Sequence, residues 1–177
     1  MALSATIFKV QLDLSDLNRN HYNSYKLTLA RHPSENDQRM MLRLLAFALY
    51  ADEQLAFTRG ISTTDEPDLW LKNYSGEIEL WIELGQPDEK RIRQAHSIAK
   101  NVVVFSYGDR SQEVWRQQLD ASIKRFPSLK VFHISDNDIK QLASLADKNM
   151  QLHCSIQDDE MFIGDDTQNL QLKINSI

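Results

Sequence analysis

The feature that most constrains the fold is residues 77–84, where apolar and polar side chains alternate without a break. Successive side chains of a β-strand point to opposite sides, so this alternation predicts a strand with one buried face. The buried side would carry Ile78, Leu80, Ile82 and Leu84, and the other side Glu77, Glu79, Trp81 and Glu83. Three carboxylates and a tryptophan on one face fit either a solvated surface or the lining of a site.

Glu83 is the acidic residue closest to the end of this strand. Gly85 stops the strand, and Pro87 with Asp88 predicts the start of a helix over residues 88–100. Proteins of the α/β class tend to place their chemistry where a strand ends and the chain turns into a helix. Glu83 is therefore a candidate site residue, whereas the start of the helix is enough to explain Asp88.

Two further segments predict the core. Residues 102–105, Val-Val-Val-Phe, are a continuous β-branched and aromatic run, as expected of a strand buried on both faces. Residues 35–51 predict a helix that becomes apolar on almost every side and so belongs in the interior, with a capping box at Ser34 and Asp37. We expect residues 102–105 to lie beside residues 77–84 in one sheet, joined by the helix between them.

The remaining segments complete an α/β pattern. Alternation predicts strands at residues 6–14, 25–29, 55–61, 129–134, 152–156, 161–163 and 170–174. Helical patterns cover residues 112–125 and 138–147, and residues 68–72 fit either a short strand or one helical turn. We expect one α/β domain over residues 1–177, with a mixed sheet and antiparallel strands at both ends.

Composition excludes several kinds of site. The single cysteine, Cys154, rules out an intramolecular disulfide and a cysteine-cluster zinc site. The first ten residues lack the pattern of a signal peptide and no apolar run reaches spanning length, so we expect a cytoplasmic protein with no membrane partner. A net charge of -5 argues against a broad electrostatic surface for nucleic acid but leaves room for a local one.

Four strings of sequence resemble the YaeQ family of bacterial proteins, and the resemblance extends over essentially the full chain. The strings are Thr28-Leu-Ala-Arg-His-Pro-Ser-Glu35, Met40-Met-Leu-Arg-Leu-Leu-Ala46, Asp65-Glu-Pro-Asp-Leu-Trp-Leu-Lys72 and Ile82-Glu-Leu-Gly-Gln-Pro-Asp-Glu89. The resemblance implies a compact α/β fold around a variant of the PD-(D/E)xK nuclease core, arranged as helix, three strands, helix and strand. It implies no particular biochemical activity.

The nuclease motif asks for a Pro-Asp pair and then, on the next strand, an acidic residue, any residue and a lysine. Pro67 and Asp68 fit the first part and Glu83 the second, but Gly85 stands at the lysine position. In this motif two carboxylates hold Mg²⁺, and the metal and the lysine activate a water for attack on a phosphodiester. The resemblance therefore implies Asp68 and Glu83 as ligands for Mg²⁺ or Mn²⁺, with Glu79 in reserve.

Further residues enter as supporting groups. Glu35 stands where members of the nuclease superfamily often place a glutamate on the first helix, although a position in a first helical turn, four residues before Arg39, also explains it. If Glu35, Asp68 and Glu83 converge, their repulsion should raise the pKa of at least one of them. A catalytic site would also need a replacement for the lysine. The nearest choices in sequence are Gln86 (through a bulge at Gly85), Lys90, Arg91 and Lys72.

Three functions stay open at this point. The first is a Mg²⁺-dependent nuclease, or another phosphodiester hydrolase, acting on nucleic acid through Asp68 and Glu83. The second is a binding or regulatory module on a degenerate nuclease fold that retains the pocket. Independently of these functions, Asp68 could simply cap a short turn after Pro67. The third is an enzyme acting on a small phosphate-bearing substrate, which suits the acidic composition better than a long duplex does.

Overall fold

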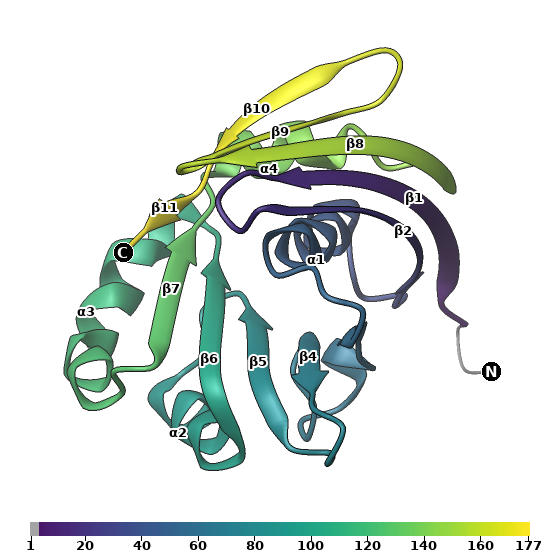
Figure 1. Ribbon diagram of the computed structural model, residues 1–177. Helices are drawn as coiled ribbons and strands as arrows, with labels where there is room; N and C mark the ends of the chain where they lie inside the picture. Colours follow the sequence, from purple (N-terminus) through teal and green to yellow (C-terminus); the bar gives the residue numbers. More distant parts are fainter. Residues whose placement is uncertain (1–3) are drawn as a thin grey trace. The chain divides into compact units, whose positions relative to one another are not determined.

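The structure, a computed structural model, describes residues 4–177, except for the side chains of Ser62, Ser122 and Ile123. The described residues form two sheets, four α-helices and a short 3-10 helix (Figure 1). Contacts between residues group the chain into two compact units, each of which holds one sheet. The first unit contains Met1–Leu49 and Asn137–Ile174, and the second contains Tyr50–Asp136 and Asn175–Ile177.

The first unit is built on a five-stranded sheet with the order β10-β9-β8-β1-β2. Its strands are β1 (Thr6–Asp16), β2 (His21–Arg31), β8 (Asn149–Gln157), β9 (Glu160–Gly164) and β10 (Asn169–Lys173). Neighbouring strands are antiparallel except for β1 and β8, which run parallel. The sheet is therefore mixed, and the last three strands are antiparallel neighbours in sequence order, as expected for the end of the chain.

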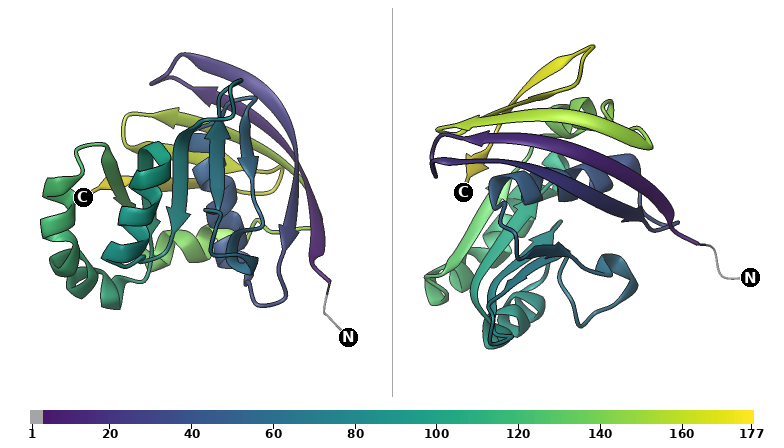
Figure 2. Two further views of the ribbon diagram at one scale, coloured as in Figure 1. Left: turned by 90° about the horizontal axis from the view of Figure 1, so that it is seen from below. Right: turned by 45° about the vertical axis from the view of Figure 1, so that its right-hand side comes forward.

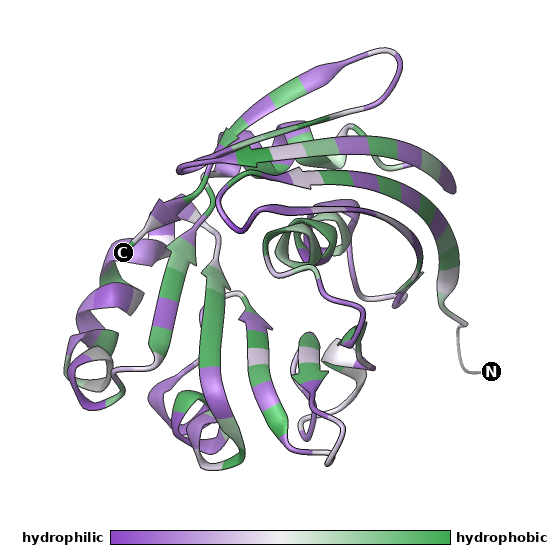
Figure 3. Cartoon of the chain, viewed as in Figure 1, coloured by the Kyte–Doolittle hydropathy of each residue, from purple (hydrophilic) through white to green (hydrophobic). Residues whose placement is uncertain are grey.

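Helix α1 (Asp37–Leu49) lies against one face of this sheet (Figures 1 and 2). On β1 every second side chain from Phe8 to Leu14 is buried, and α1 is buried without interruption from Met40 to Ala48. Figure 3 shows the same alternation as hydrophobic and hydrophilic bands along β1 and β8. The expectation of an interior helix at this place is confirmed. The other face of the sheet carries the alternate, polar positions.

The connection between the first two strands is shorter than the sequence predicts. Residues 15 and 16 continue β1, residues 17–20 form the turn, and β2 starts at His21. Asn20 takes a φ of 54°, a left-handed conformation that asparagine tolerates better than most residues. Residues 15–24, which lie between the two predicted strands, therefore lengthen both strands and form the tight turn of a long hairpin.

The start of α1 also differs from the prediction, because Asn36 caps the helix in place of Ser34. The Asn36 Oδ1 atom accepts a hydrogen bond from the Arg39 amide at 2.9 Å, whereas the Ser34 hydroxyl lies 2.7 Å from His32 Nδ1. The helix starts at Asp37. Glu35 consequently precedes the helix and does not stand in its first turn.

The second unit is built on a six-stranded sheet with the order β11-β7-β6-β5-β4-β3. Its strands are β3 (Leu55–Phe57), β4 (Leu69–Lys72), β5 (Ile78–Leu84), β6 (Ala99–Ser106), β7 (Leu129–His133) and β11 (Asn175–Ser176). Strands β5, β6 and β7 are parallel neighbours, joined by α2 (Glu89–Ile98) and α3 (Asp109–Arg125). The predicted pairing of residues 102–105 with residues 77–84, through a helix, is confirmed.

Helices α2 and α3 pack on one face of this sheet. Trp81 lies in one apolar cluster with Ile92 and Ala95 of α2 and Trp115 and Leu119 of α3. The prediction that β5 has a single buried face is therefore wrong for its second half, where Trp81 is 0% exposed and Glu83 only 8%. The reason is tertiary, because a helix covers the face that alternation alone assigns to solvent.

Several smaller points also differ from the sequence-based expectations. The terminal strands form a sheet of their own instead of flanking the central one. Residues 68–72 resolve into strand β4, β3 ends at Phe57, and α2 ends at Ile98. The last helix, α4 (Asp136–Ala143), is shorter than residues 138–147. Within residues 4–177, no helix combines the length and the apolar character that crossing a membrane requires.

Candidate functional site

Asp68 lies immediately before β4 and reaches across to β5 with both its backbone and its side chain. Its amide donates to the Ile82 carbonyl at 3.0 Å, and its Oδ2 atom accepts from the Leu84 amide at 2.9 Å. These bonds end on the two residues that flank Glu83. The pairing of β4 with β5 therefore places the buried Asp68 carboxylate beside Glu83.

The Glu83 carboxylate is held through one of its oxygens. Oε1 accepts from Trp81 Nε1 at 3.2 Å and from Arg91 Nε and Nη2 at 3.0 and 2.7 Å. Among the described residues, no hydrogen bond to this carboxylate ends on Oε2. Glu83 thus points to the α2 side of the sheet with one oxygen fixed and the other available.

Arg91 joins three parts of the second unit. Its guanidinium contacts Glu83 of β5, and it donates to the carbonyls of Thr64 and, at 2.8 Å, Glu66 in the loop before β4. It also lies over the ring of Trp81, with 5.2 Å between its Cζ and the ring centroid. Asp88 supports this placement by capping α2, since it accepts the Arg91 amide at 2.8 Å. The expected capping role of Asp88 is confirmed.

The protonation of Glu83 is shifted by its surroundings. Burial raises the pKa of the Glu83 carboxyl above its ordinary value, and the neighbouring Asp68 carboxylate raises it as well, against the lowering effects of Arg91 and Trp81. The largest cause is the loss of water around the charged form, so repulsion between carboxylates is the smaller contribution. A raised pKa in a pair of buried carboxylates is a feature of functional sites, although structural ion pairs also produce it.

Glu35 belongs to the first unit, whereas Asp68 and Glu83 belong to the second. Its carboxylate binds Arg39 Nη1 at 3.0 Å and Arg43 Nη2 at 2.5 Å, and the side chains of Glu35 and Arg43 are both buried. Arg43 also donates to the Ala30 carbonyl at 2.9 Å. Within its own unit, Glu35 therefore has a clear structural role in tying α1 to the end of β2.

The other predicted site residues have different neighbours. The Gln86 amide donates to the Tyr107 carbonyl at 3.0 Å, while Lys90 is exposed and makes no ion pair within residues 4–177. The Lys72 ammonium lies 4.0 Å from the centroid of the Trp70 ring. Glu79 pairs with Lys100 at 2.7 Å, which lowers its pKa. Of the cations considered from the sequence, Arg91 is the one that contacts Glu83.

The geometry does not assemble a larger metal-binding cluster. Among the described residues, no group of three or more histidine, cysteine, aspartate or glutamate side chains is arranged to hold a metal ion. The carboxylates that the structure brings together are those of Asp68 and Glu83. Any metal at this place would have to complete its coordination with water or substrate.

Sequence reasoning missed a second polar cluster, at the carboxyl ends of β6 and β7. Ser106 Oγ lies 3.2 Å from His133 Nδ1, and His133 Nε2 lies 2.8 Å from Asp109 Oδ1. The bond to His133 holds the pKa of Asp109 below its ordinary value. The sequence pattern that could have predicted this cluster is that Ser106 and His133 stand at the ends of two neighbouring parallel strands, whose carboxyl ends meet at one edge of the sheet. Ser106 is 0% exposed, so the cluster fixes α3 to the sheet and offers no accessible nucleophile.

Fold and site together define an α/β protein with two mixed sheets and a buried carboxylate pair contacted by an arginine. The chain belongs to the YaeQ family, because the family model described as YaeQ protein matches residues 1–174. The chain is 46% identical over 176 residues to the uncharacterized protein YaeQ of Salmonella typhi, and this match covers 99% of this chain and 97% of that protein. It is 45% identical to the uncharacterized protein YaeQ of Escherichia coli strain K12, with the same coverage.

Two crystal structures of YaeQ proteins share this fold. The protein from Xanthomonas axonopodis pv. citri has a TM-score of 0.94 and 40% sequence identity, with 98% of each chain covered. The protein from Pseudomonas syringae has a TM-score of 0.92 and 34% identity, with 98% of this chain and 96% of that chain covered. The α/β fold described above is therefore shared across bacterial members of the family.

Proposed function

We propose that Asp68 and Glu83 form the metal-binding pair of a Mg²⁺-dependent phosphodiester hydrolase with a PD-(D/E)xK nuclease-like core. The proposal rests on one observation above all, namely that a cation, Arg91, reaches Glu83 from the following helix. Gly85 leaves the lysine position of the motif without a side chain, and Arg91 brings a positive charge to the acidic residue from another backbone position. The element order α1, β3, β4, β5, α2, β6 agrees with the order of the nuclease core.

The residues present fit Mg²⁺. This ion prefers oxygen ligands and commonly uses one or two carboxylates, with water in its other positions. Asp68 and Glu83 would hold it, since their carboxylates are neighbours and Glu83 Oε2 accepts no hydrogen bond from the described residues. A bound Mg²⁺ would supply Lewis-acid polarisation of a phosphodiester.

Residues of the chain hold the two carboxylates in place and bring one positive charge to Glu83. Trp81 and Arg91 fix the orientation of Glu83, and the Leu84 amide fixes Asp68. Burial of both carboxylates lowers the local dielectric, which strengthens every charge interaction there. The planar guanidinium of Arg91 is the side-chain type that pairs best with phosphate oxygens. The donors of Arg91 are bonded to Glu83 and to groups of the loop before β4 and of α2, so a phosphodiester would pair with this guanidinium by displacing some of those bonds.

Thermal unfolding with and without millimolar Mg²⁺ or Mn²⁺ tests the metal site. Binding to the folded state at about a hundred times Kd adds roughly 2.7 kcal/mol, which raises the Tm of a chain of this size by several degrees. Glu83→Gln removes a ligand charge and should abolish most of this rise. Glu79→Gln is the matched control, because Glu79 lies on the same strand but pairs with Lys100. Equal rises in both variants, or an unchanged wild-type Tm, would count against the site.

Hydrolysis itself requires a second readout. Purified wild type with Mg²⁺ should cleave labelled oligonucleotides, and Glu83→Gln and Asp68→Asn should lower the rate at least a hundredfold, as expected for groups that hold the metal. Stabilisation by metal without cleavage of any oligonucleotide would favour the third candidate, an enzyme acting on a small phosphate-bearing substrate through the same residues.

The second candidate function is a binding or regulatory module on a degenerate form of this core. It is favoured by the internal partners of the carboxylates, because the Leu84 amide and Arg91 already satisfy one oxygen of each. A salt bridge that replaces the metal would let the fold persist without catalysis. In that case neither Mg²⁺ nor Mn²⁺ changes the Tm, and Arg91 matters for stability alone.

A further inference from the structure

The polar face of the five-stranded sheet in the first unit, opposite α1, has an ordered pattern of side chains. Residues that pair across neighbouring strands share a face, so the register of β2, β1, β8 and β9 arranges this face in rows. One row runs Tyr22, Ser15, Ser155, Phe162. Gln171 of β10 continues the row beyond Phe162. Two aromatic rings thus flank a pair of small serines.

Both rings are exposed, with 59% of Tyr22 and 40% of Phe162 accessible. Within the described residues, neither ring stacks on another ring. Three strand spacings separate Tyr22 from Phe162, which is roughly 14 Å for strands about 4.8 Å apart. The two serines between the rings are small and half-buried. Two exposed aromatic faces at this spacing can each take a flat apolar group.

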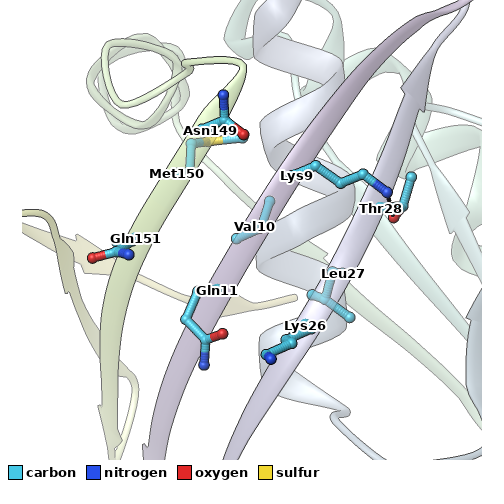
Figure 4. Close-up of a pocket in the computed structure, with 9 residues that line it drawn as sticks. All are labelled: Lys9, Val10, Gln11, Lys26, Leu27, Thr28, Asn149, Met150 and Gln151. Carbon is cyan, nitrogen blue, oxygen red and sulfur yellow. Dashed lines mark hydrogen bonds between the residues drawn. The ribbon is translucent and has the colours of Figure 1, made fainter.

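Two neighbouring rows add positive charge and amide groups. They contain Thr28, Lys9 and Asn149 in one row and Lys26, Gln11 and Gln151 in the next (Figure 4). These six side chains line a shallow hollow of about 390 Å³. Lys9 donates to Thr28 Oγ1 at 2.8 Å, which leaves two of the three donors of its ammonium group for a ligand.

The row between the lysines and the aromatic rings contains Ser24, Asp13 and His153. Asp13 is the one acidic side chain among these four rows, and it accepts hydrogen bonds from Ser24 at 2.6 Å and Gln11 at 3.4 Å. The whole chain, in contrast, has 25 acidic and 20 basic residues. These four rows therefore carry two lysines and one aspartate, and the next row adds Glu160 together with Lys173.

From this juxtaposition we infer that the polar face of the first unit binds single-stranded nucleic acid, with Tyr22 and Phe162 stacking on bases and Lys9 and Lys26 binding phosphates. Single strands are held by a combination of aromatic side chains for bases and cations for the backbone. Amide and hydroxyl side chains are common partners of phosphate, sugar and base edges. In a duplex the base faces are stacked on each other, so exposed rings on a sheet can reach only unpaired bases.

Other occupants fit this face less well. The core of a protein–protein interface is depleted in lysine and enriched in apolar groups, whereas here amides, hydroxyls and lysines lie between two isolated rings. The inference goes beyond the proposed hydrolysis and does not depend on it, because it concerns binding by residues other than Asp68 and Glu83.

Fluorescence anisotropy tests the inference on the whole chain, with a labelled mixed-sequence single-stranded oligonucleotide, low salt and EDTA to prevent any cleavage. Wild type should bind the single strand at least tenfold more tightly than a duplex of the same sequence. Tyr22→Ala and Phe162→Ala should each weaken binding by about fivefold or more, as expected for loss of one stacked base. Lys9→Gln and Lys26→Gln should each reduce the slope of log K against log salt by about 0.7.

The controls are exposed residues of the same types that lie outside this face. Tyr74→Ala removes a tyrosine that is 99% exposed and lies in the second unit, and Lys140→Gln removes an exposed lysine of α4. Both should leave binding unchanged, and all variants should keep the wild-type Tm because the altered side chains are exposed.

Three outcomes would each overturn the inference: no binding of the single strand at low salt, equal or tighter binding of the duplex, or losses of affinity in the control variants as large as in the four test variants. The inference would also be overturned if the four variants abolished self-association or oligosaccharide binding but left oligonucleotide binding unchanged. Failure of the proposed hydrolysis would not affect the inference.

Discussion

At the scale of single residues, Glu83 and Arg91 illustrate how burial and charge compete. Burial raises the pKa of Glu83, while Arg91 lowers it and keeps the carboxylate compatible with an interior position. A buried ion pair contributes little net stability over an apolar pair, but loss of one partner is costly because the other charge stays buried. Replacing either residue of the pair should therefore lower the stability of the second unit.

Arg91→Gln should lower the free energy of unfolding at neutral pH by about 2 kcal/mol, somewhat less than for a fully buried pair. The folded-state pKa of Glu83 is already raised, and loss of Arg91 raises it further. A raised carboxyl pKa makes stability fall as pH rises from the unfolded-state value through the folded-state value. The loss should therefore be large at neutral pH and small at pH 4, and urea titrations at the two pH values measure it.

Lys90→Gln is the control for this prediction, because Lys90 is the exposed neighbour of Arg91 on α2. Its effect should stay within about 0.5 kcal/mol at both pH values, as for other surface changes. A loss for Arg91→Gln that is equally large at pH 4 would mean that Arg91 contributes through its bonds to the Thr64 and Glu66 carbonyls and its packing against Trp81, and not through the charge of Glu83.

At the scale of elements, the hairpin of β9 and β10 depends on a position without a side chain. A Cβ atom at Gly164 would lie 2.3 Å from the Gln168 carbonyl oxygen and 2.9 Å from Asn169 Cα, both of them backbone atoms. No rotamer change can relieve such a contact. The strand end or the loop has to move instead.

Gly164→Ala should therefore destabilise the protein by about 2–3 kcal/mol, the cost of overpacking at a rigid position. Gly76→Ala is the comparison, since a Cβ there meets nothing within 4 Å but the φ of +85° is left-handed. That conformation alone should cost about 1–2 kcal/mol for alanine. Urea unfolding of both variants separates the two causes. An effect at Gly164 no larger than at Gly76 would show that the hairpin relaxes freely.

At the scale of the whole molecule, the chain passes between its two compact units three times, after residues 49, 136 and 174. Neither unit is therefore one continuous segment that could be cut out of the chain. The single domain over residues 1–177 stays a prediction, and cooperative unfolding is its natural test.

The residue types provide a separate probe for each unit. All three tryptophans, Trp70, Trp81 and Trp115, lie in the second unit, and the one cysteine, Cys154, lies in the first. Burial raises the pKa of the Cys154 thiol to about 12, so it should react with thiol reagents only after the first unit opens. In a urea titration, tryptophan fluorescence and thiol reactivity should give the same midpoint. Two separate midpoints would mean that the units unfold independently.

Local patterns were sufficient for most of the secondary structure. The alternation at residues 77–84, the apolar run at 102–105 and the all-apolar helix after residue 37 each depend on neighbours in sequence, and each became the expected element. The four sequence strings likewise identified the family, which the family model and the relatives confirm.

Only the tertiary structure decided which faces are buried and which side chains meet. Trp81 and Glu83 are buried because α2, a separate element, covers their face of β5. Among Lys90, Arg91 and Lys72, sequence spacing could not choose the cation at Glu83, because the choice depends on the direction of each side chain from α2 and β4. The division of the strands into two sheets depends on pairings between distant segments, such as β1 with β8, and no local periodicity records them.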